Sequence, residues 1–280
     1  MGLSSSLTDH ALLDAARRGD RSAIDTLLDR HQARIYRFGM KMCGNPEDAR
    51  DVLQETLLAM ARTVRDFREE SSVSTWLYSI ARSFCVKKRR KRKFAPDRVR
   101  SLETDLPLEA RRLVDPGRRP DELLAGKELH HALQRSIDSL DPMSREVLIL
   151  RDFEGLTAPE VAEVIGVSVD AIKSRLHRAR LAVRSAMAPL VAPASEEHTP
   201  APGRCPEVLS LYSQHLEGEI DTEVCGEMEK HIAACGRCRA SCDSLKKVLA
   251  LCRSIPAERV PEPVQESVRA EILKVLPVSP

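Results

Sequence analysis

The sequence contains few aromatic residues: one Trp, three Tyr and five Phe amount to 3% of its 280 residues. Alternating runs of Val and Thr, which favour β-strands, are also scarce. Most of the chain instead repeats apolar residues at spacings of three and four, the period of an amphipathic helix. Because hydrophobic residues still reach 42%, packed cores are expected and wholesale disorder is not. The sequence therefore predicts an all-α protein.

Long apolar runs are missing too. No stretch of 18 consecutive apolar residues occurs, so no membrane-spanning helix is predicted. The first nine residues lack the charged and apolar parts of a secretion signal, and we expect a cytoplasmic protein. Cysteine is frequent for that compartment: eight are present, and six of them follow residue 200. Such a cluster favours metal binding or redox sensing over disulfide bonds.

Proline-rich stretches divide the helical pattern into domains. The first domain contains a helix-start signal, Asn45 followed by Pro46 and two acidic residues. In chain order we predict a helical domain over 8–93, a linker over 94–121, a second helical domain over 122–190, a linker over 191–204, a cysteine-rich domain over 205–253, and a tail over 254–280 with one amphipathic stretch at 264–275.

A helix-turn-helix is predicted over 157–184. Thr157 and Glu160 form a capping box at the start of a short helix, Gly166 supplies the turn, and Ser168 can cap the second helix. The second helix is apolar on one face and basic on another, the arrangement that places a recognition helix in the major groove. A helical hairpin with a solvated basic face is the alternative. The basic candidates for DNA contact are Lys173, Arg175, His177, Arg178 and Arg180.

The same residues resemble region 4 of the sigma-70 family, in its lead-in helix at 140–156 and in its recognition-helix signature at 173–180, which also contains Ser174. Residues 45–56 and 67–82 resemble region 2 of that family. The two matches come in the expected order with a linker between them. The chain is therefore similar to the small bacterial sigma factors of the extracytoplasmic-function type.

That resemblance assigns roles within the first domain. The helix after Asn45 would bind the clamp helices of core RNA polymerase, through a polar stripe able to meet a basic partner. The stripe consists of Asp48, Asp51, Gln54 and Glu55. The segment 67–82 would recognise and melt the promoter −10 element, where a polar loop could hold a flipped base.

Seven consecutive bases at 87–93 follow that segment, although the net charge of the chain is only +2. A charge run alone is usually solvated, but beside a promoter-melting segment it predicts phosphate contacts that do not read sequence. Trp76 is more often a core residue than a stacking platform. The candidate DNA contacts of the first domain are Ser71, Ser72, Thr75, Trp76, Arg82, Lys87, Lys88, Arg89 and Arg90. The family commonly has Asn and Asp after this segment, whereas this chain has 83–86 as Ser-Phe-Cys-Val, so the −10 base preference does not transfer.

The cysteine-rich domain contains a metal-ligand pattern: Cys205, then His231, Cys235 and Cys238. His231 and Cys235 are four residues apart and share one helix face, and Gly236 permits the turn that brings Cys238 to the same point. Three thiolates and one imidazole suit zinc. The pattern resembles the zinc-binding anti-sigma fold. A purely structural zinc in a domain with little core is the simplest alternative.

Three further cysteines, Cys225, Cys242 and Cys252, are possible additional ligands, and surplus thiolates favour soft ions such as copper(I), cadmium or zinc. The whole arrangement resembles the CorE-type sigma factors, whose cysteine-rich domain makes activity depend on a metal ion. Metal sensing, redox sensing through a thiol–disulfide change, and an inert structural zinc all stay open. His198 and His215 are predicted to be bystanders, and no role is predicted for the isolated pair Cys43 and Cys85.

The sequence thus predicts a sigma factor without enzymatic activity of its own. It would bind core RNA polymerase and promoter DNA, at the −35 and −10 elements, and no membrane, under the control of a metal ion. Two rival classes are a helix-turn-helix regulator that works without polymerase and a membrane-linked anti-sigma protein. The region 2 resemblance disfavours the first, and the absent membrane span together with the complete sigma regions disfavours the second.

Overall fold

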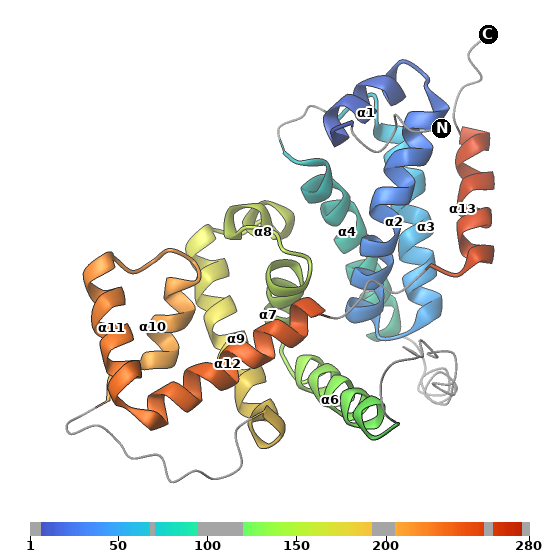
Figure 1. Ribbon diagram of the computed structural model, residues 1–280. Helices are drawn as coiled ribbons and strands as arrows, with labels where there is room; N and C mark the ends of the chain where they lie inside the picture. Colours follow the sequence, from blue (N-terminus) through green and yellow to red (C-terminus); the bar gives the residue numbers. More distant parts are fainter. Residues whose placement is uncertain (1–6, 68–70, 94–119, 192–204, 255–259, 276–280) are drawn as a thin grey trace. The chain divides into compact units, whose positions relative to one another are not determined.

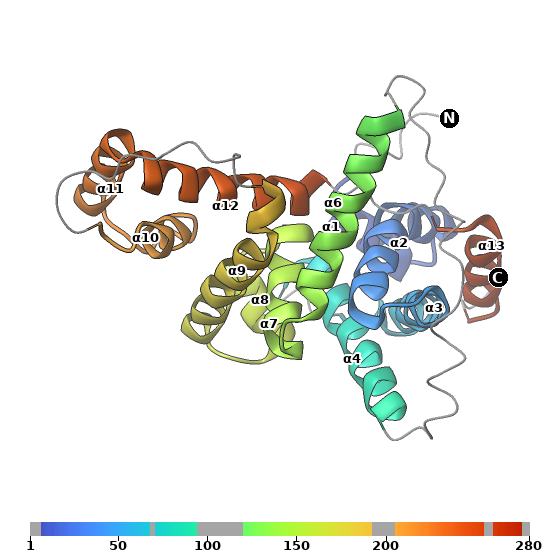
Figure 2. The same ribbon diagram turned by 90° about the horizontal axis from the view of Figure 1, so that it is seen from below.

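The computed structural model describes residues 7–67, 71–93, 120–191, 205–254 and 260–275 (Figures 1 and 2). Within these ranges the regular structure is helical and no strand occurs, which confirms the predicted all-α class. No helix in the same ranges is both long enough and apolar enough to cross a bilayer. The predicted linkers lie almost wholly outside the described residues.

The described residues form two compact units. Among the described residues, the first unit combines those up to 93 with 163–165 and 260–275, and the second combines 120–162 with 166–191 and 205–254. The cysteine-rich domain, predicted as a separate domain, therefore belongs to the same unit as the helix-turn-helix. The predicted tail groups with the first helical domain.

The first unit contains helices α1 to α4 and α13 (Figure 1). Their bounds are Asp9–Arg17, Arg21–Cys43, Pro46–Thr63, Val73–Lys93 and Glu262–Val275. The predicted start signal of α3 is confirmed, because the Asn45 side chain accepts a hydrogen bond from the Asp48 N–H at 2.8 Å. The core is built from fully buried apolar side chains such as Leu27, Phe38 and Leu53.

Close backbone packing fixes α3 against α2. A Cβ at Gly39 would lie 3.1 Å from the Cα of Ala49, so only glycine fits there without a shift of the helices. On α13, Val268 and Ile272 are buried, and the helix packs against α3 (Figures 1 and 2). The tail of the chain therefore contributes a packed helix to the first unit.

The second unit contains α6 (Pro120–Asp138), α7 (Pro142–Leu148), a π-helical turn η2 (Ile149–Phe153) and α9 (Val169–Val191), together with α8 (Ala158–Ile165) up to residue 162. The predicted capping box is confirmed, with hydrogen bonds running both ways between Thr157 and Glu160. Gly166 has φ of 80°, the left-handed conformation that ends α8 and turns the chain into α9. Ile172, Leu176, Ala179 and Val183 form the buried stripe of α9, as predicted.

Three more helices complete this unit: α10 (Val208–His215), α11 (Thr222–Ala234) and α12 (Gly236–Ser254). Both α10 and α12 pack against α9. Val208 and Met228 lie in a small apolar cluster with Cys235, Cys238 and Cys242. The sulfur atoms are thus part of the core of this small module, which we call the cysteine-rich module (residues 205–254).

Candidate metal centre and nucleic-acid interface

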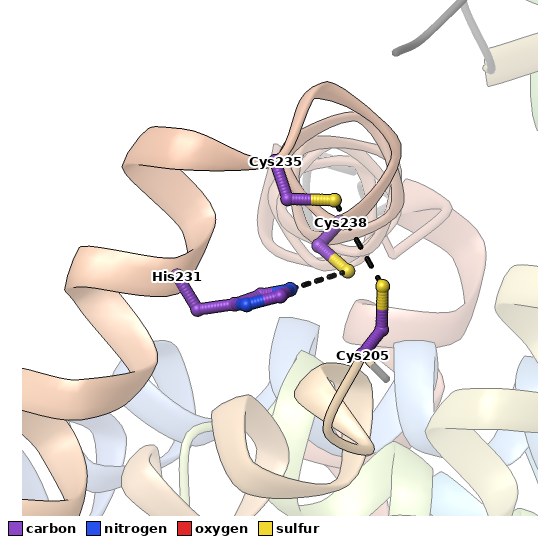
Figure 3. A group of neighbouring side chains, drawn as sticks. All are labelled: Cys205, His231, Cys235 and Cys238. Carbon is purple, nitrogen blue, oxygen red and sulfur yellow. Dashed lines mark hydrogen bonds between the residues drawn. The ribbon is translucent and has the colours of Figure 1, made fainter. Parts of the chain in front are cut away.

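The four predicted ligands Cys205, His231, Cys235 and Cys238 lie together in the cysteine-rich module (Figure 3). Their ligand atoms all fall within 4.8 Å of one another. The Sγ atoms of Cys205 and Cys235 are 3.9 Å apart, and His231 Nε2 lies 3.2 Å from Cys238 Sγ. A tetrahedral zinc ion with bonds of about 2.0–2.3 Å would separate its ligands by about 3.3–3.8 Å. The four side chains therefore fit zinc without rearrangement of the backbone.

The local fold explains why these four meet. His231 occupies the last turn of α11, Cys235 is the residue between α11 and α12, and Cys238 lies in the first turn of α12. Cys205 reaches them from the segment that precedes α10, where the guanidinium of Arg237 donates to its sulfur at 2.9 Å. Burial, with hydrogen bonds to the neighbouring cysteines, raises the pKa of the Cys238 thiol to about 12. We call these four residues the closed cluster.

The three surplus cysteines do not join the closed cluster. Cys242 and Cys252 are buried, and burial raises the pKa of the Cys242 thiol. Cys242 packs in the apolar core of the module beside Cys235 and Cys238, but it is not one of the four residues whose ligand atoms lie within 4.8 Å of one another. Cys225 lies elsewhere, with its Sγ 3.4 Å from His215 Nδ1 and 3.8 Å from Glu229 Oε1. Loss of solvent around the sulfur, with the nearby Glu229 carboxylate, raises the pKa of the Cys225 thiol.

The predicted DNA-binding residues of α9 divide into two groups. Ser174 and Arg178 are exposed, and Lys173, Arg175 and His177 are half-buried. Burial, followed by the charge of Arg180, lowers the pKa of His177 and so disfavours the charged form of this imidazole.

Arg180 itself is only 1% exposed. Its guanidinium donates to both carboxylate oxygens of Asp152, at 2.6 and 2.8 Å, and to Glu217 at 2.8 Å. Burial alone would lower the pKa of Arg180, but the two carboxylates outweigh it and raise the pKa. The prediction of a DNA contact at Arg180 is therefore corrected: this side chain is an internal ion-pair partner.

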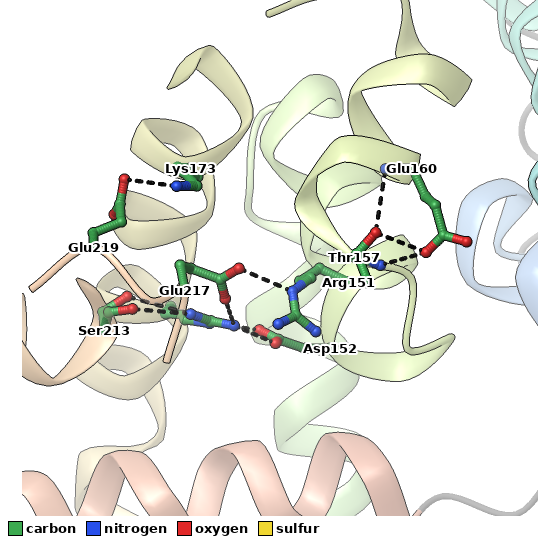
Figure 4. A network of polar contacts seen from close by, with 9 residues as sticks. Arg151, Asp152, Thr157, Glu160, Lys173, Ser213, Glu217 and Glu219 are labelled. Atoms are coloured by element: carbon green, nitrogen blue, oxygen red, sulfur yellow. Dashed lines mark hydrogen bonds and ion pairs between the residues drawn. The ribbon is translucent and has the colours of Figure 1, made fainter. Parts of the chain in front are cut away.

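Two acidic residues between α10 and α11 hold the basic helix (Figure 4). Glu217, whose side chain is 4% exposed, accepts from Arg180 and also from Arg151 at 3.0 Å. Glu219 forms an ion pair with Lys173 at 3.4 Å. Further along α9, Arg184 donates to Ser244 of α12 at 2.8 Å. These partners were missed in the sequence, because acids in a turn give no signal of a contact with residues 37 and 66 positions away.

In the first unit, the predicted polymerase-binding stripe is partly paired. Lys88, a predicted DNA contact on α4, forms ion pairs with Asp48, at 3.0 Å, and with Asp51. Burial would lower the pKa of Lys88, but the hydrogen bonds to Asp51 and Asp48 outweigh it and raise the pKa. Gln54 is half-buried and Glu55 is exposed on the same helix.

The predicted −10 contacts at the start of α4 are divided as well. Thr75 is fully buried, and its hydroxyl lies 2.8 Å from that of Ser72, which caps α4 by accepting from the Thr75 N–H. The prediction of a DNA contact at Thr75 is corrected on this ground. The Trp76 ring stacks on Phe67, with centroids 4.4 Å apart. The other candidates have half-buried or exposed side chains: Ser71, Arg82, Lys87, Arg89 and Arg90.

Cys43 and Cys85, for which the sequence predicted no role, lie side by side. Their Sγ atoms are 3.7 Å apart, between the end of α2 and the middle of α4. Cys85 is fully buried, and Cys43 is half-buried. The two thiols are 42 residues apart in the chain and meet where α2 packs against α4.

Comparison with known protein families gives three matches. Residues 27–95 match Sigma-70 region 2, residues 130–183 match Sigma-70 region 4, and residues 205–239 match a family described as a putative zinc-finger. The zinc-finger match contains all four residues of the closed cluster.

Sigma factors that match about two thirds of the chain agree with these assignments. Over 184 residues the chain is 32% identical to the ECF RNA polymerase sigma factor SigE of Mycolicibacterium smegmatis, covering 65% of this chain and 68% of that protein. It is 30% identical over 187 residues to the RNA polymerase sigma-H factor of Pseudomonas aeruginosa, covering 65% of this chain and 95% of that protein. Among solved structures, CnrH in complex with the cytosolic domain of CnrY matches with a TM-score of 0.46 and 25% identity, over 63% of this chain and 95% of that one.

Proposed function

The chain belongs to the ECF family of RNA polymerase sigma factors and directs transcription by that enzyme, and we propose that a metal ion bound in the cysteine-rich module controls this activity. In the proposal, the first unit binds core polymerase and opens the −10 element, while α9 reads the −35 element. The chain performs no chemical step of its own. The module decides how much of α9 is available to DNA.

One observation carries the proposal: the module that contains the metal-ligand cluster is also the module that holds α9. Glu219 neutralises Lys173, a residue whose charge would otherwise face a phosphate. Glu217 anchors the same loop on Arg151 and Arg180 with its carboxylate almost fully buried. Any change in the loop that carries these two acids therefore alters the charge presented by α9.

The closed cluster makes the fold of the cysteine-rich module depend on a metal ion. Its donors are three sulfurs and one nitrogen within 4.8 Å, the set that zinc prefers, and cadmium and copper(I) share the preference for thiolates. A bound ion would cross-link the start of α10, the end of α11 and the start of α12, so the position of the loop between α10 and α11 depends on it. Metal binding in such small domains is coupled to folding.

The test is run-off transcription with the purified full-length chain and core RNA polymerase on a library of genomic promoters. Zinc, cadmium and copper(I) are compared with a chelator. We expect the amount of transcript to change by between about 5- and 150-fold with metal, the range typical of coupled sites. Equal transcript in every metal condition would overturn metal control, and no transcript from any promoter would overturn the sigma activity of this chain.

A matched pair of variants tests the contact itself. Glu219→Gln removes the charge that faces Lys173. Glu223→Gln is the matched variant, because it removes the charge of another exposed glutamate, on α11. We expect Glu219→Gln to raise affinity for promoter DNA and steepen its dependence on salt, because one more cation reaches the phosphates. Glu223→Gln should behave as wild type. Identical salt dependence for both variants would place Lys173 outside the DNA interface.

A further inference from the structure

A second group of metal-ligand side chains lies at the surface of the module and shares no residue with the closed cluster. His215 is the last residue of α10, and Cys225 and Glu229 lie one turn apart on α11; Figure 1 shows these two helices. The Cys225 sulfur lies 3.4 Å from His215 Nδ1 and 3.8 Å from Glu229 Oε1. The sequence had assigned His215 as a bystander and Cys225 as a possible extra ligand of the other site.

We propose that His215, Cys225 and Glu229 form a second site, which binds an exchangeable borderline-soft divalent cation, zinc or cadmium. We call these three residues the open cluster. A thiolate, an imidazole and a carboxylate are all ligands that zinc accepts. The Cys225 sulfur lies 3.4 and 3.8 Å from the other two ligand atoms, which matches the edges of a tetrahedron around such an ion. Rotation of the exposed side chains of His215 and Glu229 would bring all three ligands to one ion. Only three protein ligands are provided, so one position stays open to water.

Exposure separates this site from the closed cluster. His215 and Glu229 are exposed and Cys225 is half-buried. In the closed cluster Cys235 and Cys238 are buried in the core, Cys205 and His231 are half-buried, and no ligand is exposed. An ion in the open cluster can therefore exchange with solvent while the fold of the module is retained. Carboxylate ligation disfavours copper(I), which leaves zinc and cadmium as the chemical class.

The position of the open cluster links it to α9. His215 precedes Glu217 by two residues and Glu219 by four, and Gly218, with φ of 68°, turns the chain between those acids. Glu217 and Glu219 are the residues that hold Arg151, Arg180 and Lys173. An ion that draws His215 toward Cys225 and Glu229 would tighten the junction of α10 and α11. The pairing of the two acids with α9 would change with it.

This inference rests on the proposed metal control for its consequence in transcription, but the site itself can be tested alone. The full chain is purified with zinc, dialysed against zinc or cadmium, and analysed for metal ions per chain by mass spectrometry. We expect two ions in wild type, one of which is removed by a weak chelator. Cys225→Ser, His215→Gln and Glu229→Gln should keep only the tightly held ion. Even loss of an outer-shell partner weakens metal binding by roughly 10–100-fold, so loss of a ligand should weaken it at least as much.

Glu227→Gln is the matched control, because Glu227 is an exposed acid on α11 that lies two residues before Glu229. It should bind two ions like wild type. One ion in wild type, or two in Glu229→Gln with unchanged affinity, overturns the site. If the second ion binds while transcription ignores metal, the site stands and the proposed control fails. If transcription responds equally in wild type and Cys225→Ser while both bind two ions, metal control stands and the open cluster fails.

Discussion

Two clusters of ligand side chains lie in one small module, and they differ in what surrounds them. The closed cluster is part of the core, where Cys235 and Cys238 pack with Val208 and Met228. The open cluster lies on the surface at the junction of α10 and α11. Both contain histidine and cysteine, so ligand type alone does not distinguish them.

Burial is what gives the clusters different tasks. An ion in a core replaces apolar contacts and is required for the fold, because the apo state leaves sulfurs and an imidazole packed without a common partner. An ion on the surface adds a cross-link to a fold that already exists, so its binding can vary with the concentration of metal. The first kind of site suits stability, and the second suits sensing.

The largest effect is expected from the closed cluster. His231→Gln removes one of four ligands, and zinc in comparable small domains contributes on the order of 10 kcal/mol to folding. We expect the cysteine-rich module to unfold and the tightly bound ion to be lost, as measured by metal content and by hydrogen exchange over residues 205–254. His215→Gln, the same substitution in the open cluster, should leave both unchanged. A folded, zinc-loaded His231→Gln variant would contradict this division.

The next largest effect is expected at Glu217, which connects the module to α9. Glu217→Gln leaves Asp152 as the one carboxylate paired with Arg180 and leaves Arg151 without the carboxylate of Glu217. Breaking a buried ion pair by removing one member costs about 3–5 kcal/mol of folding free energy. Gln is a neutral isostere that can still accept a hydrogen bond, so the cost of Glu217→Gln should be only part of that amount. We expect the thermal stability of the second unit to fall. The backbone amides of the loop between α10 and α11 should exchange faster with solvent. Glu219→Gln is the control, because partly exposed pairs contribute about 0–1 kcal/mol.

A third prediction concerns the part of α9 that the module leaves accessible. Arg175→Ala or Arg178→Ala should weaken −35 binding by about 1–3 kcal/mol if the residue contacts a base bidentately. Because neither side chain is paired with Glu217 or Glu219, the loss should be equal with and without metal. Lys173→Ala should weaken −35 binding only when the loop between α10 and α11 has moved so that Glu219 no longer pairs with Lys173. The measurement is DNA affinity on matched and mismatched −35 sequences, and a metal-dependent effect at Arg178 would show that the module covers more of α9.

Much of this arrangement was predictable because its signals are local. Thr157 with Glu160, Gly166, and the spacing of His231, Cys235 and Cys238 each depend on residues within one or two helical turns. Local spacing fixes which side chains share a helix face, so both the helix-turn-helix and the closed cluster could be predicted from the sequence.

The errors have a common physical origin in long-range packing. Arg180 was assigned to DNA because the sequence shows a basic helix face, but not that Asp152 and Glu217, 28 and 37 residues away, would bury that guanidinium. Thr75 was assigned from a family role, while in this fold its hydroxyl pairs with the residue that caps α4. His215 was dismissed because it belongs to no linear spacing pattern with Cys225, ten residues away.

The smallest effect is expected at the two cysteines that belong to neither cluster. Cys242→Ser and Cys252→Ser exchange a buried thiol for a hydroxyl of similar size, and burial of an uncompensated hydroxyl costs about 1–3 kcal/mol in proteins. The α-helix offers each hydroxyl a backbone carbonyl one turn earlier, so we expect the lower end of that range.

Metal stoichiometry and the response of transcription to zinc and cadmium should stay as in wild type for both variants, because neither sulfur is a ligand in either cluster. Thermal unfolding and metal titration of the two variants beside Cys225→Ser measure this directly. If Cys242→Ser changed the metal that is bound while Cys225→Ser did not, the closed cluster would recruit a fourth sulfur from its own core. Sensing would then belong to the buried site, and the contrast between the two clusters would be reversed.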